Sequence, residues 1–295
     1  MRENGPVTSA TRQPETKASA VPPRLIATDL DGTLLRDDKS VSPRTVAALA
    51  AAEEAGIEVF FVTGRPARWM DVVSDHVHGH GLAICGNGAA VVDLHGGPGS
   101  HRFVKVRELA RENALDAVRL VREAAPGTVY AIELTYGFYQ EQAYPKLHME
   151  IPDSLATAEK LLAPDAPGAD EPVLKILAFH PELDPDVFLN VARLALGDRA
   201  NVTRSSPSAL LEISGPGVSK ASTLALCCAE RGIAPEEVVA FGDMPNDVEM
   251  LTWAGQSYAM GNAHPAALAA ASGRTVDNNE DGVAVVIERM LAERR

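Results

Sequence analysis

Between residues 23 and 85, short continuous apolar runs alternate with stretches of helical periodicity. Residues 24–28, 57–62 and 82–84 are apolar runs of the kind found in strands that are buried on both faces of a parallel sheet. Between the first two, Ser42 and Pro43 predict the start of a helix and Gly56 its end. A second helix is predicted at about 67–77. This alternation predicts an α/β fold with a doubly wound, Rossmann-like parallel sheet.

The alternation of predicted strands and helices stops after Cys85 and resumes near Ser219. There a helix to about Arg231 is followed by the apolar run 238–241. The intervening segment holds four predicted strands among Pro- and Gly-rich stretches and helical patterns, at 90–93, 131–139, 174–179 and 209–213. We therefore interpret residues 86–214 as an inserted α+β domain. The core domain then consists of residues 23–85 and 215–295, and residues 1–22 form a disordered tail.

The balance of charges excludes several classes of partner. Lys and Arg total 27 against 40 Asp and Glu, so the net charge of −13 repels nucleic acid and anionic membrane surfaces. The three cysteines offer neither a disulfide framework nor zinc-site spacing, and no apolar run approaches the roughly 20 residues of a membrane span. We expect a cytoplasmic protein with a small-molecule partner; whether it is a monomer or a homodimer is left open.

Two carboxylates follow the first predicted strand, in Asp29-Leu30-Asp31-Gly32-Thr33-Leu34. The carboxyl ends of strands are where open α/β sheets bind ligands, and strand alternation predicts that Asp29 and Asp31 point the same way. One carboxylate can act as a covalent nucleophile while the other protonates the leaving oxygen and then activates water. The pair is therefore a candidate catalytic site for phosphoryl transfer.

A phosphate dianion could approach two carboxylates only if a cation neutralised them. Asp243 follows the apolar run 238–241, at the same predicted edge of the sheet, and supplies a further oxygen ligand. Ligands that are all oxygen favour Mg²⁺ over zinc.

Other polar residues stand where a phosphate could be held. Thr63 and Gly64 follow the second predicted strand, where a hydroxyl and backbone amides suit a phosphate oxygen. Lys220, at the start of its helix, could offset the charge of a transferring phosphoryl group. Asp247 could orient that lysine, and Asn246 could donate to the phosphate.

Taken in order, DLDGTLL, VTGR, the lysine of GVSK and GDMPND resemble the four motifs of the haloacid dehalogenase superfamily of phosphatases. Asn87-Gly88-Ala89, the long insertion and Asn279-Glu280-Asp281-Gly282-Val283-Ala284 are similar to the Cof-type subfamily, whose members carry a C2-type cap. Ala221 departs from the glycine that often follows the motif lysine, which affects only local backbone detail.

The resemblance implies a role for each matching position. Asp29 would be the nucleophile and a metal ligand, Asp31 the acid/base and a ligand through its carbonyl, and Asp243 the other ligand of Mg²⁺. The phosphate would be contacted by the Leu30 backbone, Thr63, Gly64, Lys220 and Asn246. The inserted cap would recognise the leaving group, and we expect it to open and close over the site as a lid.

Three other patterns favour ordinary structural explanations. His76, His78 and His80 lie in a Gly-rich stretch without accompanying acids, so a polar loop explains them better than a metal site. Gly86-Asn87-Gly88 lacks the third glycine and the helix of a dinucleotide loop. Within the insertion, Glu133, Tyr136, Tyr139 and Tyr144 could meet a substrate, but strand aromatics are usually packing residues.

The function predicted from sequence is therefore a Mg²⁺-dependent phosphatase that hydrolyses a small phosphorylated metabolite, such as a sugar phosphate, through an aspartyl-phosphate. Two alternatives stay open. A phosphomutase of the same superfamily would return the phosphoryl group to its substrate, and a non-catalytic regulatory protein would bind phosphate without turnover.

Overall fold

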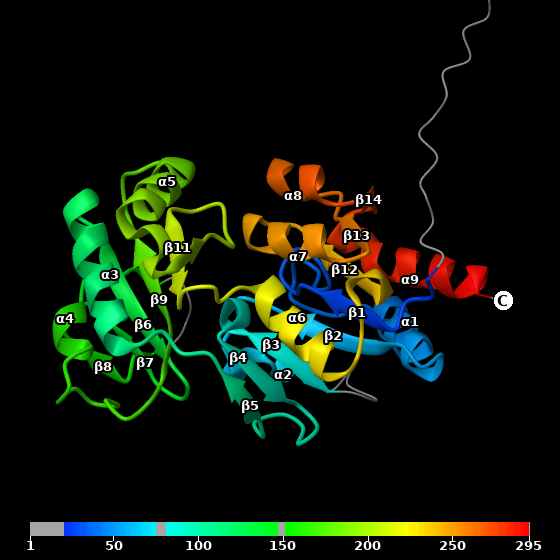
Figure 1. Ribbon diagram of the computed structural model, residues 1–295, viewed down its shortest axis with the longest axis horizontal. Coiled ribbons are helices and arrows are strands. Elements are labelled where there is room, and N and C mark those ends of the chain that lie inside the picture. The colour runs from blue at the N-terminus through cyan, green and yellow to red at the C-terminus, as the bar shows by residue number, and fades with distance from the viewer. Residues whose placement is uncertain (1–20, 75–80, 147–150, 295) are drawn as a thin grey trace, which may run out of the picture.

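The computed structural model describes residues 21–74, 81–146 and 151–294. The predicted tail therefore lies almost wholly outside the described residues, as do His76, His78 and His80. Two sheets form the centres of the right and left halves of the molecule in Figure 1.

The larger sheet has eight strands. In spatial order they are β14 (Gly273–Arg274), β13 (Gln256–Ala259), β12 (Val238–Gly242), β1 (Leu25–Thr28), β2 (Glu58–Val62), β3 (Leu82–Cys85), β4 (Ala90–Asp93) and β5 (Arg102–Val106). Pairing is parallel from β14 to β3 and antiparallel from β3 to β5. The predicted α/β fold with a parallel-rich central sheet is confirmed.

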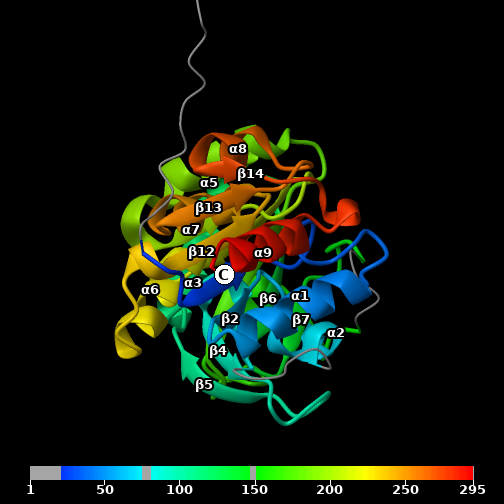
Figure 2. The ribbon, with the colours of Figure 1, turned by 90° about the vertical axis from the view of Figure 1, so that its right-hand side faces the viewer.

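Helices cover both faces of the larger sheet, which is why its central strands are mostly apolar. Figure 2 shows β2 and β12 between α6 on one side and α1 on the other. The helices of this half are α1 (Pro43–Glu54), α2 (Asp71–Ser74), α6 (Lys220–Glu230), α7 (Val248–Trp253), α8 (Pro265–Ala270) and α9 (Gly282–Glu293). As predicted, α1 begins after Ser42, whose hydroxyl accepts a hydrogen bond from the Thr45 amide at 3.0 Å.

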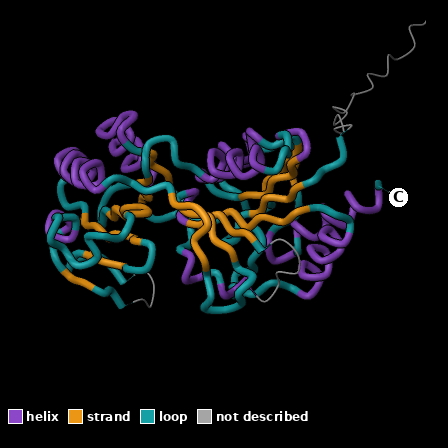
Figure 3. The backbone as a smooth tube through the Cα atoms, turned by 60° about the horizontal axis from the view of Figure 1, so that its bottom comes forward, coloured by secondary structure: helices purple, strands orange, loops and turns teal. Residues whose placement is uncertain are grey.

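The smaller sheet has six strands and carries its helices on one face. In spatial order its strands are β10 (Asn201–Thr203), β11 (Leu210–Ser214), β9 (Val173–Phe179), β6 (Val129–Leu134), β7 (Phe138–Gln140) and β8 (Ser154–Leu155). Its helices are α3 (Arg111–Ala124), α4 (Ala158–Leu161) and α5 (Pro185–Leu196). They lie on the side away from the larger sheet, so the other face of the smaller sheet is turned toward the core (Figures 1 and 3).

The insertion was predicted to start at residue 86, but the larger sheet does not end there. β4 and β5 continue the larger sheet by antiparallel pairing from β3, and the chain leaves that sheet only after Val106. We call residues 107–214 the cap. Its two connections lie side by side, because a Cβ built at Gly215 would be 2.9 Å from the Glu108 carbonyl oxygen.

Two predicted elements are divided in the structure. The strand expected at 131–139 is the hairpin of β6 and β7, with Gly137 in the turn, and Tyr139 and Tyr144 are buried among cap residues. The helix expected at 67–77 is, over its described residues, a short 3₁₀ helix η1 (Ala67–Trp69) followed by α2; residues 75–77 lie outside the described ranges. No helix in the described ranges combines the length and apolar character needed to cross a membrane.

Candidate active site

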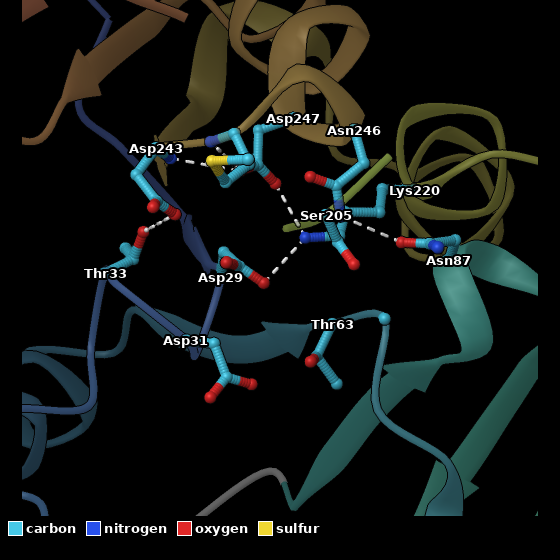
Figure 4. A network of polar contacts seen from close by, with 12 residues as sticks. Asp29, Asp31, Thr33, Thr63, Asn87, Ser205, Lys220, Asp243, Asn246 and Asp247 are labelled. Carbon is cyan, nitrogen blue, oxygen red and sulfur yellow. Dashed lines mark hydrogen bonds and ion pairs between the residues drawn. The ribbon is translucent and has the colours of Figure 1, made fainter. Parts of the chain in front are cut away.

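Loops that are distant in sequence meet at one edge of the larger sheet, where its parallel strands end (Figure 4). Asp29 follows β1, Thr63 follows β2 and Asp243 follows β12. Lys220 is the first residue of α6, where the Ser219 hydroxyl caps the helix by accepting from the Ser222 amide. The sheet topology and one helix start therefore bring these four side chains together.

Lys220 connects two of the acidic residues. Its Nζ donates to Asp29 Oδ1 at 2.6 Å and to Asp247 Oδ1 at 2.7 Å, and the lysine side chain has no exposed surface. Burial alone would lower the pKa of this lysine, but the charges of Asp247 and Asp29 outweigh it and hold the pKa above its ordinary value. The ammonium is therefore a permanent positive charge at the site.

One lysine does not neutralise the acids around it. Asp29, Asp243 and Asp247 each place a carboxylate oxygen within 4.8 Å of the others, and all three are buried. Burial, and then the neighbouring carboxylates against the opposing charge of Lys220, raise the pKa of Asp29 well above its ordinary value. Burial and Asp247 likewise raise the pKa of Asp243 to about 7. Such a cluster of carboxylate oxygens fits a hard divalent cation.

Asp247 makes more contacts than its predicted role, the orientation of Lys220, would need. Besides the contact with Lys220, its Oδ2 accepts from the backbone amides of Asp243 and Met244, both at 3.0 Å. A Cβ built at Gly242 would overlap the Asp247 side chain, so only glycine leaves room for this arrangement. Asp247 thus both orients Lys220 and belongs to the acidic cluster.

Thr33 and Gly32 place the Asp243 carboxylate beside the loop that follows β1. Thr33 Oγ1 donates to Asp243 Oδ1 at 3.0 Å. Gly32 has φ +76°, and a Cβ at this position would collide with the same carboxylate. The Leu30 carbonyl accepts from the amides of Thr33 and Leu35 and so closes the turn. Sequence reasoning did not select Thr33, although it stands inside the first motif.

Asp31 does not point toward the acidic cluster, in contrast to the expectation from strand alternation. β1 ends at Thr28, so Asp31 lies in a turn, and Figure 4 shows its carboxylate directed away from Asp243. Arg65 donates to it twice, at 2.6 and 2.7 Å, and Lys39 once, at 2.9 Å. Although burial opposes ionisation, these contacts with Arg65 and Lys39 lower the pKa of Asp31 to about 2. Arg65 is a second residue that sequence reasoning did not select.

Two further predicted phosphate contacts, Thr63 and Asn246, lie near Lys220 and the acids (Figure 4). Thr63 Oγ1 accepts from the Arg65 amide at 3.1 Å, which leaves its own proton available to a ligand. Asn246 Nδ2 donates to Asn87 Oδ1 at 3.0 Å, and the Asn87 side chain lies against Gly64. Asn87 lies in the short 3₁₀ helix η2 (Gly86–Gly88); it belongs to two short motifs noted in the sequence, but sequence reasoning did not select it as a site residue.

Comparisons with known proteins agree over nearly the whole chain. A family model described as haloacid dehalogenase-like hydrolase matches residues 26–287. The 5-amino-6-(5-phospho-D-ribitylamino)uracil phosphatase YcsE of Bacillus subtilis is 27% identical, over 91% of this chain and 96% of its own. Pyridoxal phosphate phosphatase YbhA of Escherichia coli is 30% identical, over 90% and 97%. The structure of SMU.1108c from Streptococcus mutans has a TM-score of 0.78 at 24% identity, over 92% and 99%.

The raised pKa of Asp243 predicts that the metal-free protein loses stability as the pH rises. The folded state keeps this proton up to about pH 7, whereas an unfolded chain releases it near the ordinary value of 3.8, so the folded state binds more protons across that window. Asp243→Asn should therefore raise the free energy of unfolding at about pH 8 by about 1–3 kcal/mol.

Urea unfolding in EDTA at a series of pH values measures this effect. The exposed acid Asp198 offers the matched control, because Asp198→Asn should leave the pH dependence of stability unchanged. A wild-type pH dependence in Asp243→Asn would contradict the assignment of the raised pKa.

Proposed function

The chain belongs to the haloacid dehalogenase-like hydrolase family, and from this premise we propose that it is a Mg²⁺-dependent phosphatase that forms an aspartyl-phosphate on Asp29. The family and the phosphatases that align with nearly its whole length identify it as a phosphatase of small phosphorylated metabolites. The proposal of Asp29 as nucleophile rests on one observation, the buried contact of its carboxylate with Lys220 inside the acidic cluster.

Asp29, Asp243 and the Asp31 carbonyl would hold the Mg²⁺, with Asp247 close enough to contribute. The raised pKa values of Asp29 and Asp243 support this assignment, because burial and then the neighbouring carboxylates disfavour the ionised forms, and a bound cation would offset both effects. A bound divalent ion would neutralise the carboxylates and allow a phosphate dianion to approach. An all-oxygen donor set is the chemistry that Mg²⁺ prefers.

In the proposed reaction an Asp29 oxygen attacks phosphorus, the Asp29–phosphate bond forms and the bond to the leaving oxygen breaks. Asp31 gives the departing alkoxide its proton. Asp31 then accepts a proton from water, whose oxygen attacks phosphorus and displaces the Asp29 carboxylate. Lys220, Thr63, Gly64 and Asn246 hold the phosphoryl oxygens meanwhile.

The low pKa of Asp31 adds a requirement to this scheme. While Arg65 and Lys39 hold the carboxylate, it is ionised at neutral pH and has no proton to give. The acid step therefore requires that substrate entry draw Arg65 and Lys39 away from Asp31, so that its burial and the negative charge of the phosphate raise its pKa above the ordinary value.

The relatives suggest which leaving groups to test first. Their names specify 5-amino-6-(5-phospho-D-ribitylamino)uracil for one and pyridoxal phosphate for the other, and both carry the phosphate on a molecule with a nitrogen heterocycle. We propose a substrate panel that pairs these compounds with sugar phosphates. Assay of a hexose phosphate for isomerised product against free phosphate separates hydrolysis from phosphomutase activity.

Replacing the nucleophile gives the most direct test of the chemistry. Asp29→Asn should lower kcat for p-nitrophenyl phosphate by about 1,000-fold or more, because an amide cannot form the acyl-phosphate. Phosphate release in magnesium buffer measures it, with circular dichroism to confirm folding and Asp198→Asn as the surface control. Asp29→Asn with wild-type kcat would rule out an aspartyl-phosphate on this residue.

Binding of Mg²⁺ should release protons near neutral pH, since Asp243 must lose the proton that it holds up to about pH 7. The affinity should rise as the pH increases through that value. Titration calorimetry in buffers of different ionisation enthalpy measures both quantities without turnover. Asp243→Asn should bind Mg²⁺ at least about tenfold more weakly and without this proton release; binding that is unaffected by the substitution would contradict the ligand assignment.

A further inference from the structure

A buried ion pair of the cap lies against the phosphate side of the candidate site. Lys175 in β9 and Glu212 in β11 are 4% and 3% exposed and stand on the face of the smaller sheet that is turned toward the core. Lys175 Nζ donates to Glu212 Oε2 and, across the boundary between cap and core, to the Gly64 carbonyl oxygen at 2.6 Å. The cap thus contacts the backbone of the loop that follows β2.

Glu212 reaches the same loop from another side. A Cβ built at Gly64 would lie 3.3 Å from Glu212 Oε1 and 3.2 Å from Asn87 Oδ1, so both side chains pack on the glycine. Asn87 in turn accepts the hydrogen bond of Asn246. Burial opposes ionisation of Glu212, but Lys175, and then Ser205 and Asn87, hold its pKa below the ordinary value.

The contact with Gly64 fixes one peptide plane. The carbonyl and the amide hydrogen of a trans peptide point in opposite directions, and the described chain has no cis peptide bond. With the Gly64 carbonyl directed to Lys175, the amide of Arg65 is directed to Thr63 Oγ1, which accepts its hydrogen. The hydroxyl proton of Thr63 is then left to donate to a bound phosphate.

We propose that Lys175 and Glu212 are positioning residues, through which the seated cap completes the phosphate-binding loop. This inference rests on the proposed function, because it assigns Thr63, Gly64 and Asn246 to the phosphate. Lys175 sets the Gly64–Arg65 peptide and hence the Thr63 hydroxyl, while Glu212 keeps Lys175 in place and packs against Asn87.

The pair needs both charges for different reasons. Glu212 alone would leave a carboxylate beside a phosphate dianion, and Lys175 alone would leave an unpaired buried ammonium. Together they carry no net charge, so the phosphate loop gains a hydrogen-bond donor without a change in net charge. A variant that leaves one charge unpaired should therefore lose stability and substrate affinity as well as kcat, whereas a variant that removes both charges should lose kcat alone.

The test compares Lys175→Met with the double variant Lys175→Met/Glu212→Gln in the full chain. We expect Lys175→Met to lower kcat/KM by about 100-fold, with a lower Tm and a higher KM, because Glu212 keeps an uncompensated charge. The double variant removes that charge, so Tm and KM should return close to wild type. Its kcat should stay about tenfold or more below wild type, because the Gly64 carbonyl still lacks its donor.

Arg122→Met is the control for a merely loosened cap. Arg122 pairs with Glu141 inside the cap at 2.8 Å, so its loss should lower Tm and leave kcat within about twofold of wild type. A double variant that regains wild-type kcat together with Tm would overturn the inference, as would a kcat loss in Arg122→Met equal to that in Lys175→Met. Should Lys175→Met fail to fold, the double variant alone decides between these outcomes.

A third measurement separates this inference from the proposed function. A wild-type protein that releases no phosphate in magnesium buffer contradicts the proposed function itself. Calorimetric binding of inorganic phosphate still tests the loop, with binding about tenfold weaker in Lys175→Met than in wild type as the expected result. Equal affinity in the two proteins would overturn the positioning role.

Discussion

The candidate site depends on one buried ammonium shared between two carboxylates. Without Lys220, the buried carboxylates of Asp29 and Asp247 would lose the cation that they share, and leaving buried charges unpaired is strongly destabilising. Lys220 stands where the chain returns from the cap to the core, so the site can form only once that connection has closed onto the larger sheet. The glycines at 32 and 242 then let the acids approach one another more closely than a side chain at either position would permit.

A buried lysine paired with a carboxylate occurs twice, once in the core and once in the cap. In the core, Lys220 pairs with Asp29 and Asp247; in the cap, Lys175 pairs with Glu212 beside the loop that follows β2. Both lysines are buried, and each contacts a part of the chain remote from its own. The cap is therefore bound to the active site by polar contacts of defined direction as well as by apolar packing, such as that of Leu174 against the core cluster.

Much of this arrangement could be read from the sequence, because parallel strands that end at one edge of a sheet impose proximity on the residues that follow them. The apolar runs before Asp29, Thr63 and Asp243 were sufficient for that inference, and the family resemblance is confirmed. The predicted boundary at residue 86 was wrong as the edge of the larger sheet. Antiparallel strands that extend a parallel sheet have the same pattern of apolar and polar residues as strands of a separate sheet, so the sequence does not distinguish them. The direction of Asp31 was predicted wrongly because β1 ends at Thr28, so the alternation of side chains along a strand does not extend to Asp31. The pairing of Lys175 with Glu212 could not be predicted, since it depends on which face of the smaller sheet meets the core.

The central position of β1 has a consequence for biosynthesis. Its partner on one side, β2, follows closely in the chain, but its partner on the other side, β12, is synthesised only after the whole cap, and Asp243 follows Thr33 by 210 residues. An apolar strand edge therefore stays unpaired while the ribosome completes the cap, and non-local pairing of this kind is slow to form and prone to aggregation. The central sheet can therefore be completed only after β12 has left the exit tunnel.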